Sequence, residues 1–228
     1  MEYAIEVRDL CVSFSGKGSP VNALDGLNLQ VPKGEVFGFL GPNGAGKTTT
    51  MHVLLGFIRA TSGEASILGT DVRRPIARRR IGYLPEHPDT YPFLSGRELL
   101  TLTGRLFGID RRVLRERSRA LLRNVGMEDS ADRRIATYSR GMLQRICMAQ
   151  ALINEPELVI LDEPTGGLDP FGRMEVRRLI SELRAQGKTV FFSSHELSEV
   201  ELTCDRVAIA AQGRIVAEGR AKDLVDEN

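Results

Sequence analysis

The chain has 228 residues, of which 42% are apolar and 27% charged, so it can bury a sizeable core and keep a polar surface. Its formal net charge of +1 excludes a strong overall electrostatic field, and we therefore expect no nucleic-acid partner. No apolar run approaches the ~18 residues that a membrane span requires, which excludes a span within this chain.

Cysteine usage and the first residues bear on the compartment. Cys11, Cys147 and Cys204 are odd in number and show no metal-binding spacing, which fits a reducing cytoplasm. The first residues lack the basic and apolar regions of a signal peptide. We expect a cytoplasmic protein.

Arginines cluster locally although the net charge is small. The clusters lie at residues 73–74, 78–80, 111–119 and 133–134. The plain interpretation is a solvated helix and loop surface. The alternative is a basic face near phospholipid headgroups or a partner.

The N-terminal part of the chain reads as β-structure. Strand-like runs are expected at residues 4–7, 12–14 and 27–31, with turns at 16–20 and 32–34. A short apolar run at residues 35–40 predicts a buried strand, and residues 48–57 predict a helix.

Between that strand and that helix lies a glycine-rich loop. Gly41, Gly46, Lys47 and Thr48 fill the pattern G-x-x-x-x-G-K-[ST], which cradles nucleotide phosphates. Glycines turn backbone N–H groups toward an anion, the lysine reaches the β- and γ-phosphates, and the threonine hydroxyl is placed for Mg²⁺. A glycine-rich turn without a ligand is the alternative, but the strand and helix context favours a nucleotide. The residues expected to hold the nucleotide here are Gly41, Pro42, Asn43, Gly44, Ala45, Gly46, Lys47, Thr48 and Thr49.

The rest of the chain alternates between α/β and helical character. Strands are expected at residues 64–68 and 81–84, followed from 95 to 153 by a helical pattern without strand signals. After it come a strand at 158–161, a helix at 173–186, a strand at 189–193, a helix at 196–202 and a hairpin with arms at 206–210 and 214–218. We predict one domain over residues 1–228. Its α/β core would comprise residues 1–94 and 154–228, with a helical subdomain inserted at about 95–153 and a mainly parallel sheet whose ligands lie at the strand C-terminal ends.

The strand at residues 158–161 ends in two carboxylates, Asp162 and Glu163. Phosphoryl transfer to water needs such a pair, with Asp162 holding Mg²⁺ and Glu163 polarising the attacking water. Acidic pairs are also common as solvated strand ends. The phosphate loop earlier in the same chain favours the catalytic interpretation.

A second anion-binding element is expected at residues 138–145. Ser139 is a good helix N-cap, and an apolar face follows at helical spacing. A hydroxyl, a glycine (Gly141) and a helix N-terminus together can bind an anion, although an ordinary helix cap explains the same pattern. Two such elements in one chain suggest that one of them serves a neighbouring protomer.

Together these motifs resemble the ATP-binding subunits of ABC transporters, over residues 3–219. The family signature, usually Leu-Ser-Gly-Gly-Gln, aligns with residues 138–142. Ser139 and Gly141 match it. Arg140 and Met142 depart from it, in a way that resembles the ABC-2-type, drug and antibiotic exporters. The resemblance implies a P-loop NTPase (RecA-like) core with an N-terminal antiparallel β subdomain and an inserted α-helical subdomain.

The resemblance also implies roles for four further residues. Asp169 would contact the opposite protomer, His195 would contact the γ-phosphate, and Phe14 would stack on adenine. Glu86 stands where the family usually has the glutamine that ligates Mg²⁺ and water. Out of context His195 would be an ordinary surface histidine. The loop at residues 87–94 is an ordered loop or lines a groove for the membrane partner.

The function implied by the resemblance is ATP binding and hydrolysis coupled to export. Two such subunits, as a homodimer or a pseudo-dimer, would enclose two ATP molecules with Mg²⁺ and drive an integral membrane permease from the cytoplasmic face. A soluble ABC ATPase acting on the ribosome or on DNA is one alternative, although the chain has neither tandem domains nor coiled-coil or zinc insertions. An inactive regulatory subunit is the other, although Lys47, Asp162, Glu163 and His195 are all present.

Overall fold

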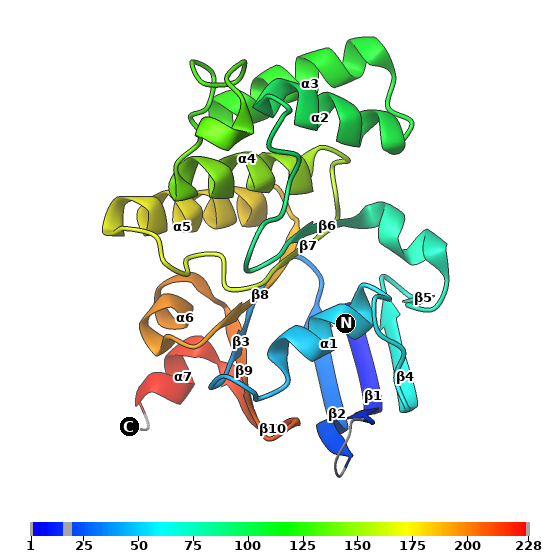
Figure 1. Ribbon diagram of the computed structural model, residues 1–228. Coiled ribbons are helices and arrows are strands. Elements are labelled where there is room, and N and C mark those ends of the chain that lie inside the picture. Colours follow the sequence, from blue (N-terminus) through cyan, green and yellow to red (C-terminus); the bar gives the residue numbers. More distant parts are fainter. Residues whose placement is uncertain (1, 16–19, 227–228) are drawn as a thin grey trace. The chain divides into compact units, whose positions relative to one another are not determined.

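The structure is a computed structural model that describes residues 2–15 and 20–226. The chain forms two compact units (Figure 1): one comprises Met1–Arg78 with Leu183–Asn228, and the other comprises Arg79–Glu182. The helical segment predicted at 95–153 lies inside the second unit, which also holds two strands.

The first unit contains an antiparallel sheet, as predicted for the N-terminal part. In the order β2-β1-β4-β5, its strands are β2 (Val21–Pro32), β1 (Tyr3–Phe14), β4 (Ser62–Ile67) and β5 (Thr70–Asp71). The two runs predicted at 4–7 and 12–14 are one strand, because register shifts near Asp9 absorb the break in pattern. Asp9 has a φ of +46°, and its N–H donates to Asn28 Oδ1 at 3.0 Å, which pairs the backbone at the bulge. Most of the turn predicted at 16–20 lies outside the described residues.

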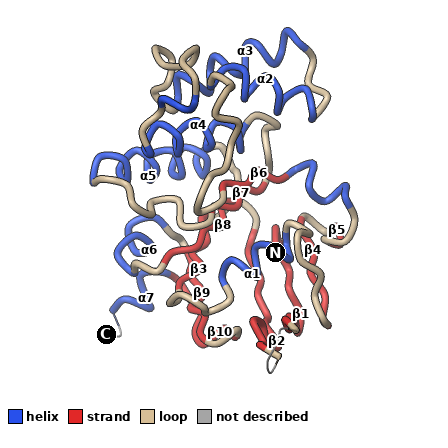
Figure 2. The backbone as a smooth tube through the Cα atoms, in the orientation of Figure 1, coloured by secondary structure: helices blue, strands red, loops and turns tan. Residues whose placement is uncertain are grey.

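A second group of strands in the same unit is mainly parallel (strands red in Figure 2). Its order is β10-β9-β3-β8, formed by β10 (Arg214–Arg220), β9 (Arg206–Ala211), β3 (Val36–Leu40) and β8 (Thr189–Ser194). β3 is parallel to β8 and β9, and β10 returns antiparallel to β9. The predicted hairpin turn is confirmed: Gln212 and Gly213 both have positive φ, +50° and +76°, which matches the right-handed twist of a two-residue hairpin.

The core of this unit is aromatic and aliphatic. Phe37, Phe39 and Phe191 are fully buried, and the Phe191 ring centroid lies 5.5 Å from that of Phe39 and 6.1 Å from that of Phe37. The helices of the unit are α1 (Lys47–Leu54), α6 (Leu197–Thr203) and α7 (Ala221–Asp226). The sequence pattern did not predict α7 or the two-residue strand β5.

The second unit joins two parallel strands to helices. β6 (Ile81–Leu84) pairs in parallel with β7 (Leu158–Leu161), at the predicted bounds. Its helices are α2 (Gly96–Leu106), α3 (Arg111–Asn124), α4 (Arg140–Leu152) and α5 (Pro170–Ala185), whose last three residues belong to the first unit. A 3₁₀ turn, η2 (Ile135–Thr137), precedes α4, and another, η1 (Pro75–Arg80), leads from the end of the first unit's segment into β6.

Within this unit α2 and α3 pack against each other and against α4 (Figure 1). Gly104 permits the close approach of α2 and α3, because a Cβ at this position would overlap the Leu114 side chain. A capping box starts α2: Ser95 Oγ accepts from Glu98 N at 3.2 Å and Glu98 Oε2 accepts from Ser95 N at 2.8 Å. Along the described chain, no helix has the length and apolar character needed to cross a bilayer.

Candidate functional site

The phosphate loop (residues 41–49) leaves the carboxyl end of β3 and enters α1 in the first unit. It folds around the Lys47 ammonium, which is buried and donates from Nζ to Gly41 O at 2.6 Å and Pro42 O at 3.3 Å. Ala45 N donates to Pro42 O at 3.2 Å and closes the turn. The loop therefore holds a positive charge at its centre, which fits a polyphosphate.

Gly46 is the N-cap of α1 and has a left-handed backbone, with a φ of +100°. A Cβ at this position would lie 2.7 Å from Leu24 Cδ2 and 2.8 Å from Ala23 O, both on β2. Within the described chain no side chain caps this helix, so backbone N–H groups of its first turn can face an anion.

The three threonines after Lys47 differ in exposure. Thr48 is exposed, Thr49 is half-buried, and Thr50 is buried with its hydroxyl donating to Gly46 O at 2.9 Å. Of the three threonines, Thr48 is the most open to solvent, and its role as a metal ligand stays a prediction. No group of three or more His, Cys, Asp or Glu side chains that could hold a metal by itself occurs in the described residues. Mg²⁺ suits this site because it takes few protein ligands and completes its shell with substrate phosphates and water.

The first unit brings His195 next to this loop. Leu40 and Ser194 are paired at the ends of parallel β3 and β8, and Gly41 N donates to Ser194 O at 3.2 Å. His195 follows directly, with 51% of its side chain exposed and Nε2 4.0 Å from Glu196 Oε1. The strand-end position predicted for His195 is therefore the one observed.

Phe14 lies on the same unit, at the end of β1. It is paired with Val21 on β2, the strand whose Ala23 and Leu24 face Gly46. Its ring is 44% exposed, as a stacking surface for a base must be.

The second unit holds the predicted carboxylates at the carboxyl ends of β6 and β7. Asp162 N donates to Leu84 O at 2.9 Å, and the side chains of Asp162 and Glu163 are 1% and 9% exposed. Glu163 has a φ of +47°, a strained conformation of the kind that clusters at functional sites. Burial, and then the negative charge of Asp162, raise the pKa of Tyr83 to about 12, so this phenol stays neutral.

Glu86 follows β6 by two residues, at the same strand ends as Asp162. Its side chain is 52% exposed, and Oε1 lies 3.9 Å from His87 Nδ1. The unit thus places Glu86, Asp162 and Glu163 at one edge of its parallel strand pair.

The signature segment opens α4 as its capping pattern predicts. Ser139 is the N-cap and its Oγ accepts from Met142 N at 3.3 Å, while a Cβ on Gly141 would meet only open space. A pocket of about 410 Å³ in this unit has Ser139, Gly141 and Asp169 in its lining. Three residues predicted to bind the nucleotide are thus brought together.

Two side chains of α4 fasten the loop that follows β7. Arg140 Nη2 donates to Gly166 O at 3.0 Å, and Gln144 Nε2 donates to Pro164 O at 2.9 Å. This loop comprises residues 163–169, so Glu163 is its first residue and Asp169 its last. Arg140 departs from the family pattern, but its partner could not be predicted, because a backbone carbonyl leaves no signal in the sequence.

Asp169 also caps α5. Its Oδ1 accepts from Gly172 N at 2.7 Å, and Pro170 occupies the first helical position. The helix therefore begins three residues before the predicted start at 173. The Asp-Pro pair was the signal that could have found it.

Comparison with known proteins identifies the family. Residues 24–166 match the sequence profile described as ABC transporter. An uncharacterized ABC transporter ATP-binding protein of Nostoc sp. is 50% identical over 207 residues, 90% of this chain and 62% of that protein. Nod factor export ATP-binding protein I of Cupriavidus pinatubonensis is 41% identical over 202 residues, 88% of this chain and 62% of that protein.

The fold agrees with these matches. A solved structure of an ATP-binding subunit of an ABC transporter superposes with a TM-score of 0.87 at 32% identity, covering 98% of this chain and 92% of that one. The chain spans only about three fifths of the two curated relatives described above, at 62% of each. The α/β fold, the motifs and the matches agree, and the chain belongs to the ABC transporter family, of which it is an ATP-binding domain.

Proposed function

We propose that this chain binds and hydrolyses ATP as one half of a dimer that drives the export of a substrate through a separate membrane permease. The observation that supports this most is that one chain carries two separate elements of the kind that can bind an anion. One is the phosphate loop around Lys47, and the other is the pocket at Ser139, Gly141 and Asp169. In the dimer, the second element of each copy would close over the nucleotide on the phosphate loop of the other copy.

The phosphate loop and Phe14 would bind ATP. Lys47 and the backbone N–H groups at the start of α1 would hold the β- and γ-phosphates. The exposed ring of Phe14 would stack on adenine. The remaining loop residues, from Gly41 to Thr49, shape the backbone around the phosphates.

Thr48, Asp162 and Glu86 would hold Mg²⁺. When bound, the ion would neutralise the negative charge that develops on the phosphates during phosphoryl transfer. A hydroxyl and two carboxylates are oxygen ligands of the type that Mg²⁺ prefers.

Hydrolysis requires a base and a group that senses the γ-phosphate. Glu163, held in a strained backbone at the end of β7, would polarise the attacking water. His195, exposed beside the phosphate loop, would hydrogen-bond to the γ-phosphate.

The proposal of export through a membrane partner rests on the relatives and on the signature. The Cupriavidus protein is named for Nod factor export, and Arg140 and Met142 in the signature resemble the ABC-2-type exporters. The chain would then act at the cytoplasmic face of the membrane, and closure of the dimer would move the permease through differential affinity of ATP for two states.

The test is a single substitution at the base. Glu163→Gln should bind ATP and form a dimer visible by light scattering, while turnover falls by about 10²–10⁴, the contribution typical of a general base. The control is Glu201→Gln, the same chemical change on an exposed residue of α6. Removal of Mg²⁺ with EDTA should abolish turnover of the unsubstituted chain. Near-normal turnover of Glu163→Gln would contradict the assignment.

A further inference from the structure

A group of arginines in the second unit is not used by any of the roles above. It lies in the hairpin of α2 and α3, where a pocket of about 200 Å³ opens between the two helices. The pocket is lined by Arg97, Thr101 and Arg105 from α2 and by Arg111, Leu114, Arg115 and Ser118 from α3.

The spacing of these residues explains why they converge. Those from α2 are four residues apart, and those from α3 are three, four and seven residues from Arg111, so each set forms one helix face. Leu114 packs against Gly104 and brings the two faces close. The arrangement is therefore built into the hairpin.

The lining carries four guanidinium groups and no carboxylate. Arg97 is neutralised by Asp132, with Nε to Oδ1 at 2.7 Å and Nη2 to Oδ2 at 3.0 Å. Across the described parts of the chain, Arg105, Arg111 and Arg115 have no ion-pair or side-chain hydrogen-bond partner. Three uncompensated cations thus surround a small pocket.

The nearest acidic residue on α3 is directed elsewhere. Glu116 does not line the pocket, and its Oε1 lies 3.5 Å from Nε of Arg112, which also lies outside the lining. The sequence therefore leaves the pocket cationic although a carboxylate is adjacent in sequence to Arg115.

Ser118 provides an independent indication of a ligand. It is only 4% exposed, it lines the pocket, and its Oγ has no hydrogen-bond partner among the described residues. A buried hydroxyl without a partner in the chain is uncommon, and either a bound water or the oxygen of a ligand can satisfy it. An oxygen acceptor in the pocket would accept from it.

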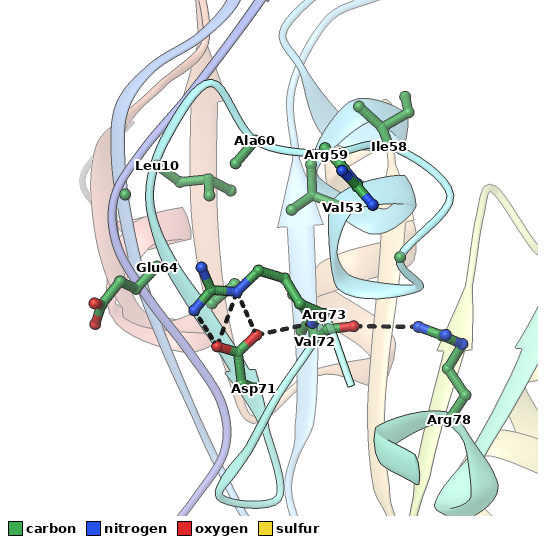
Figure 3. A pocket seen from close by; sticks show the side chains of 13 residues that line it. Leu10, Val53, Ile58, Arg59, Ala60, Glu64, Asp71, Val72, Arg73 and Arg78 are labelled. Carbon is green, nitrogen blue, oxygen red and sulfur yellow. Dashed lines mark hydrogen bonds and ion pairs between the residues drawn. The ribbon is translucent and has the colours of Figure 1, made fainter. Parts of the chain in front are cut away.

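A larger pocket in the first unit differs in this respect (Figure 3). It has a volume of about 530 Å³ and is also lined by arginines, but Arg73 forms an ion pair with Asp71 and Arg78 Nη1 donates to Val72 O at 3.1 Å. Those two guanidinium groups are satisfied from inside the unit. Arg59 also lines that larger pocket, but the carboxylates of Glu64 and Asp71 line it too, whereas the α2–α3 pocket has no carboxylate in its lining and holds the Ser118 hydroxyl.

We propose that the α2–α3 pocket binds a phosphate group. Guanidinium groups recognise phosphate through paired, charge-assisted hydrogen bonds, and Ser118 Oγ would donate one more. The volume is below the roughly 300–1,000 Å³ of pockets that take drug-sized ligands, which suits a single phosphate.

The phosphate can come from the headgroup of an anionic phospholipid or from solution. Leu106 and Phe107, which follow Arg105 at the end of α2, are 80% and 44% exposed. Apolar side chains beside arginines match a bilayer surface, where they enter the headgroup region while the cations meet lipid phosphates. These residues favour the lipid headgroup.

The experiment measures binding of the full chain to two probes. One is vesicles of phosphatidylcholine with and without phosphatidylglycerol, followed by co-sedimentation. The other is inorganic phosphate, followed by calorimetry. The pocket variant is Arg105→Gln/Arg111→Gln/Arg115→Gln. The matched control, Arg112→Gln/Arg119→Gln/Arg123→Gln, removes the same charge from α3 outside the pocket.

We expect binding to vesicles that contain phosphatidylglycerol. The pocket variant should lose about a thousandfold in affinity, since each charge-assisted hydrogen bond from an arginine to the phosphate contributes roughly tenfold. The control variant should lose clearly less. Ser118→Ala should lose about tenfold, because it removes one hydrogen bond to a charged group. Loss of inorganic phosphate binding in the pocket variant, without any binding of vesicles, would assign the same site to a soluble phosphate.

Two outcomes would overturn the proposal. In one, the pocket and control variants lose affinity equally, which would mean general attraction by charge rather than a site. In the other, neither probe binds the unsubstituted chain. Nucleotide binding measured on each variant checks that it is folded.

Discussion

Gly44 and Gly46 lie in the same loop with positive φ values, +81° and +100°, yet their surroundings differ. A Cβ on Gly44 would meet open space, whereas one on Gly46 would meet Ala23 and Leu24 of β2. At the scale of single residues, the phosphate loop thus requires glycine at position 44 for its backbone conformation alone. At position 46 it requires glycine for both the backbone conformation and the packing against β2.

This difference predicts unequal effects of alanine. Gly46→Ala should lower the free energy of unfolding by about 1–3 kcal/mol through backbone strain, with a further loss from the overlap with β2. Gly44→Ala has only the strain and should be less destabilised. Urea unfolding of both variants measures this difference. Equal losses would mean that the packing against β2 contributes nothing.

Arg140 is a second single residue on which the geometry of the site depends. Its guanidinium donates to Gly166 O and lies so close to Gly167 that a Cβ there would overlap it. It therefore holds the loop that carries Glu163 and Asp169, and we regard it as a positioning residue.

Arg140→Ala should lower kcat by up to about tenfold, the equivalent of one lost charge-assisted hydrogen bond. The affinity for ATP measured without turnover should stay unchanged, because Lys47 and its loop are intact. Gly167→Ala should reproduce the effect by displacing the guanidinium. Arg133→Ala is the control, because among the described residues the Arg133 guanidinium hydrogen-bonds only to Thr137. A change in ATP affinity equal to that in kcat would argue against a positioning role.

At the scale of elements, the strands that bear the site were predictable because each is a short apolar run with a clear end. β6 and β7 fall at their predicted bounds, and β3 begins one residue late. The continuity of β1 was not predictable, because it depends on a bulge at Asp9 that Asn28 stabilises from the neighbouring strand.

The functional site also has a part that could be predicted from the sequence and a part that could not. The residue types at the site were readable from motifs, since Lys47 and Glu163 each lie in a defined pattern. Their supporting contacts were not, because the partners of Lys47, Arg140 and Gln144 are backbone carbonyls fixed only by the fold. The uncompensated arginines of the α2–α3 pocket were visible as a cluster, but the pairing that sets Arg112 apart from Arg115 required the structure.

The start of α2 offers a test at this scale. Ser95→Ala removes one half of the capping box and should lower the free energy of unfolding by about 1 kcal/mol. Thr103→Ala on the same helix should change it by less than about 0.5 kcal/mol, because its hydroxyl only donates back to Leu99 O one turn earlier. The denaturant midpoints of the two variants measure this difference in stability. A Ser95→Ala variant as stable as Thr103→Ala would show that the cap is not needed.

At the scale of the whole molecule, one chain carries two elements that we propose to be parts of two nucleotide sites. The phosphate loop belongs to the first unit and the signature segment, with Ser139, to the second. We propose that the signature segment of each copy binds the nucleotide held by the phosphate loop of the other copy. A symmetric pair would then contain two sites, each built from both copies.

Mixing two inactive variants tests this claim most directly. Lys47→Ala and Ser139→Ala should each hydrolyse little ATP alone, since every site in either dimer has one defect. In a mixture, the heterodimer joins both defects in one site and leaves the other intact. Turnover should then recover to as much as about a quarter of that of the unsubstituted protein, because half of randomly mixed dimers are heterodimers with one working site. A mixture no more active than the average of the two variants would contradict the account.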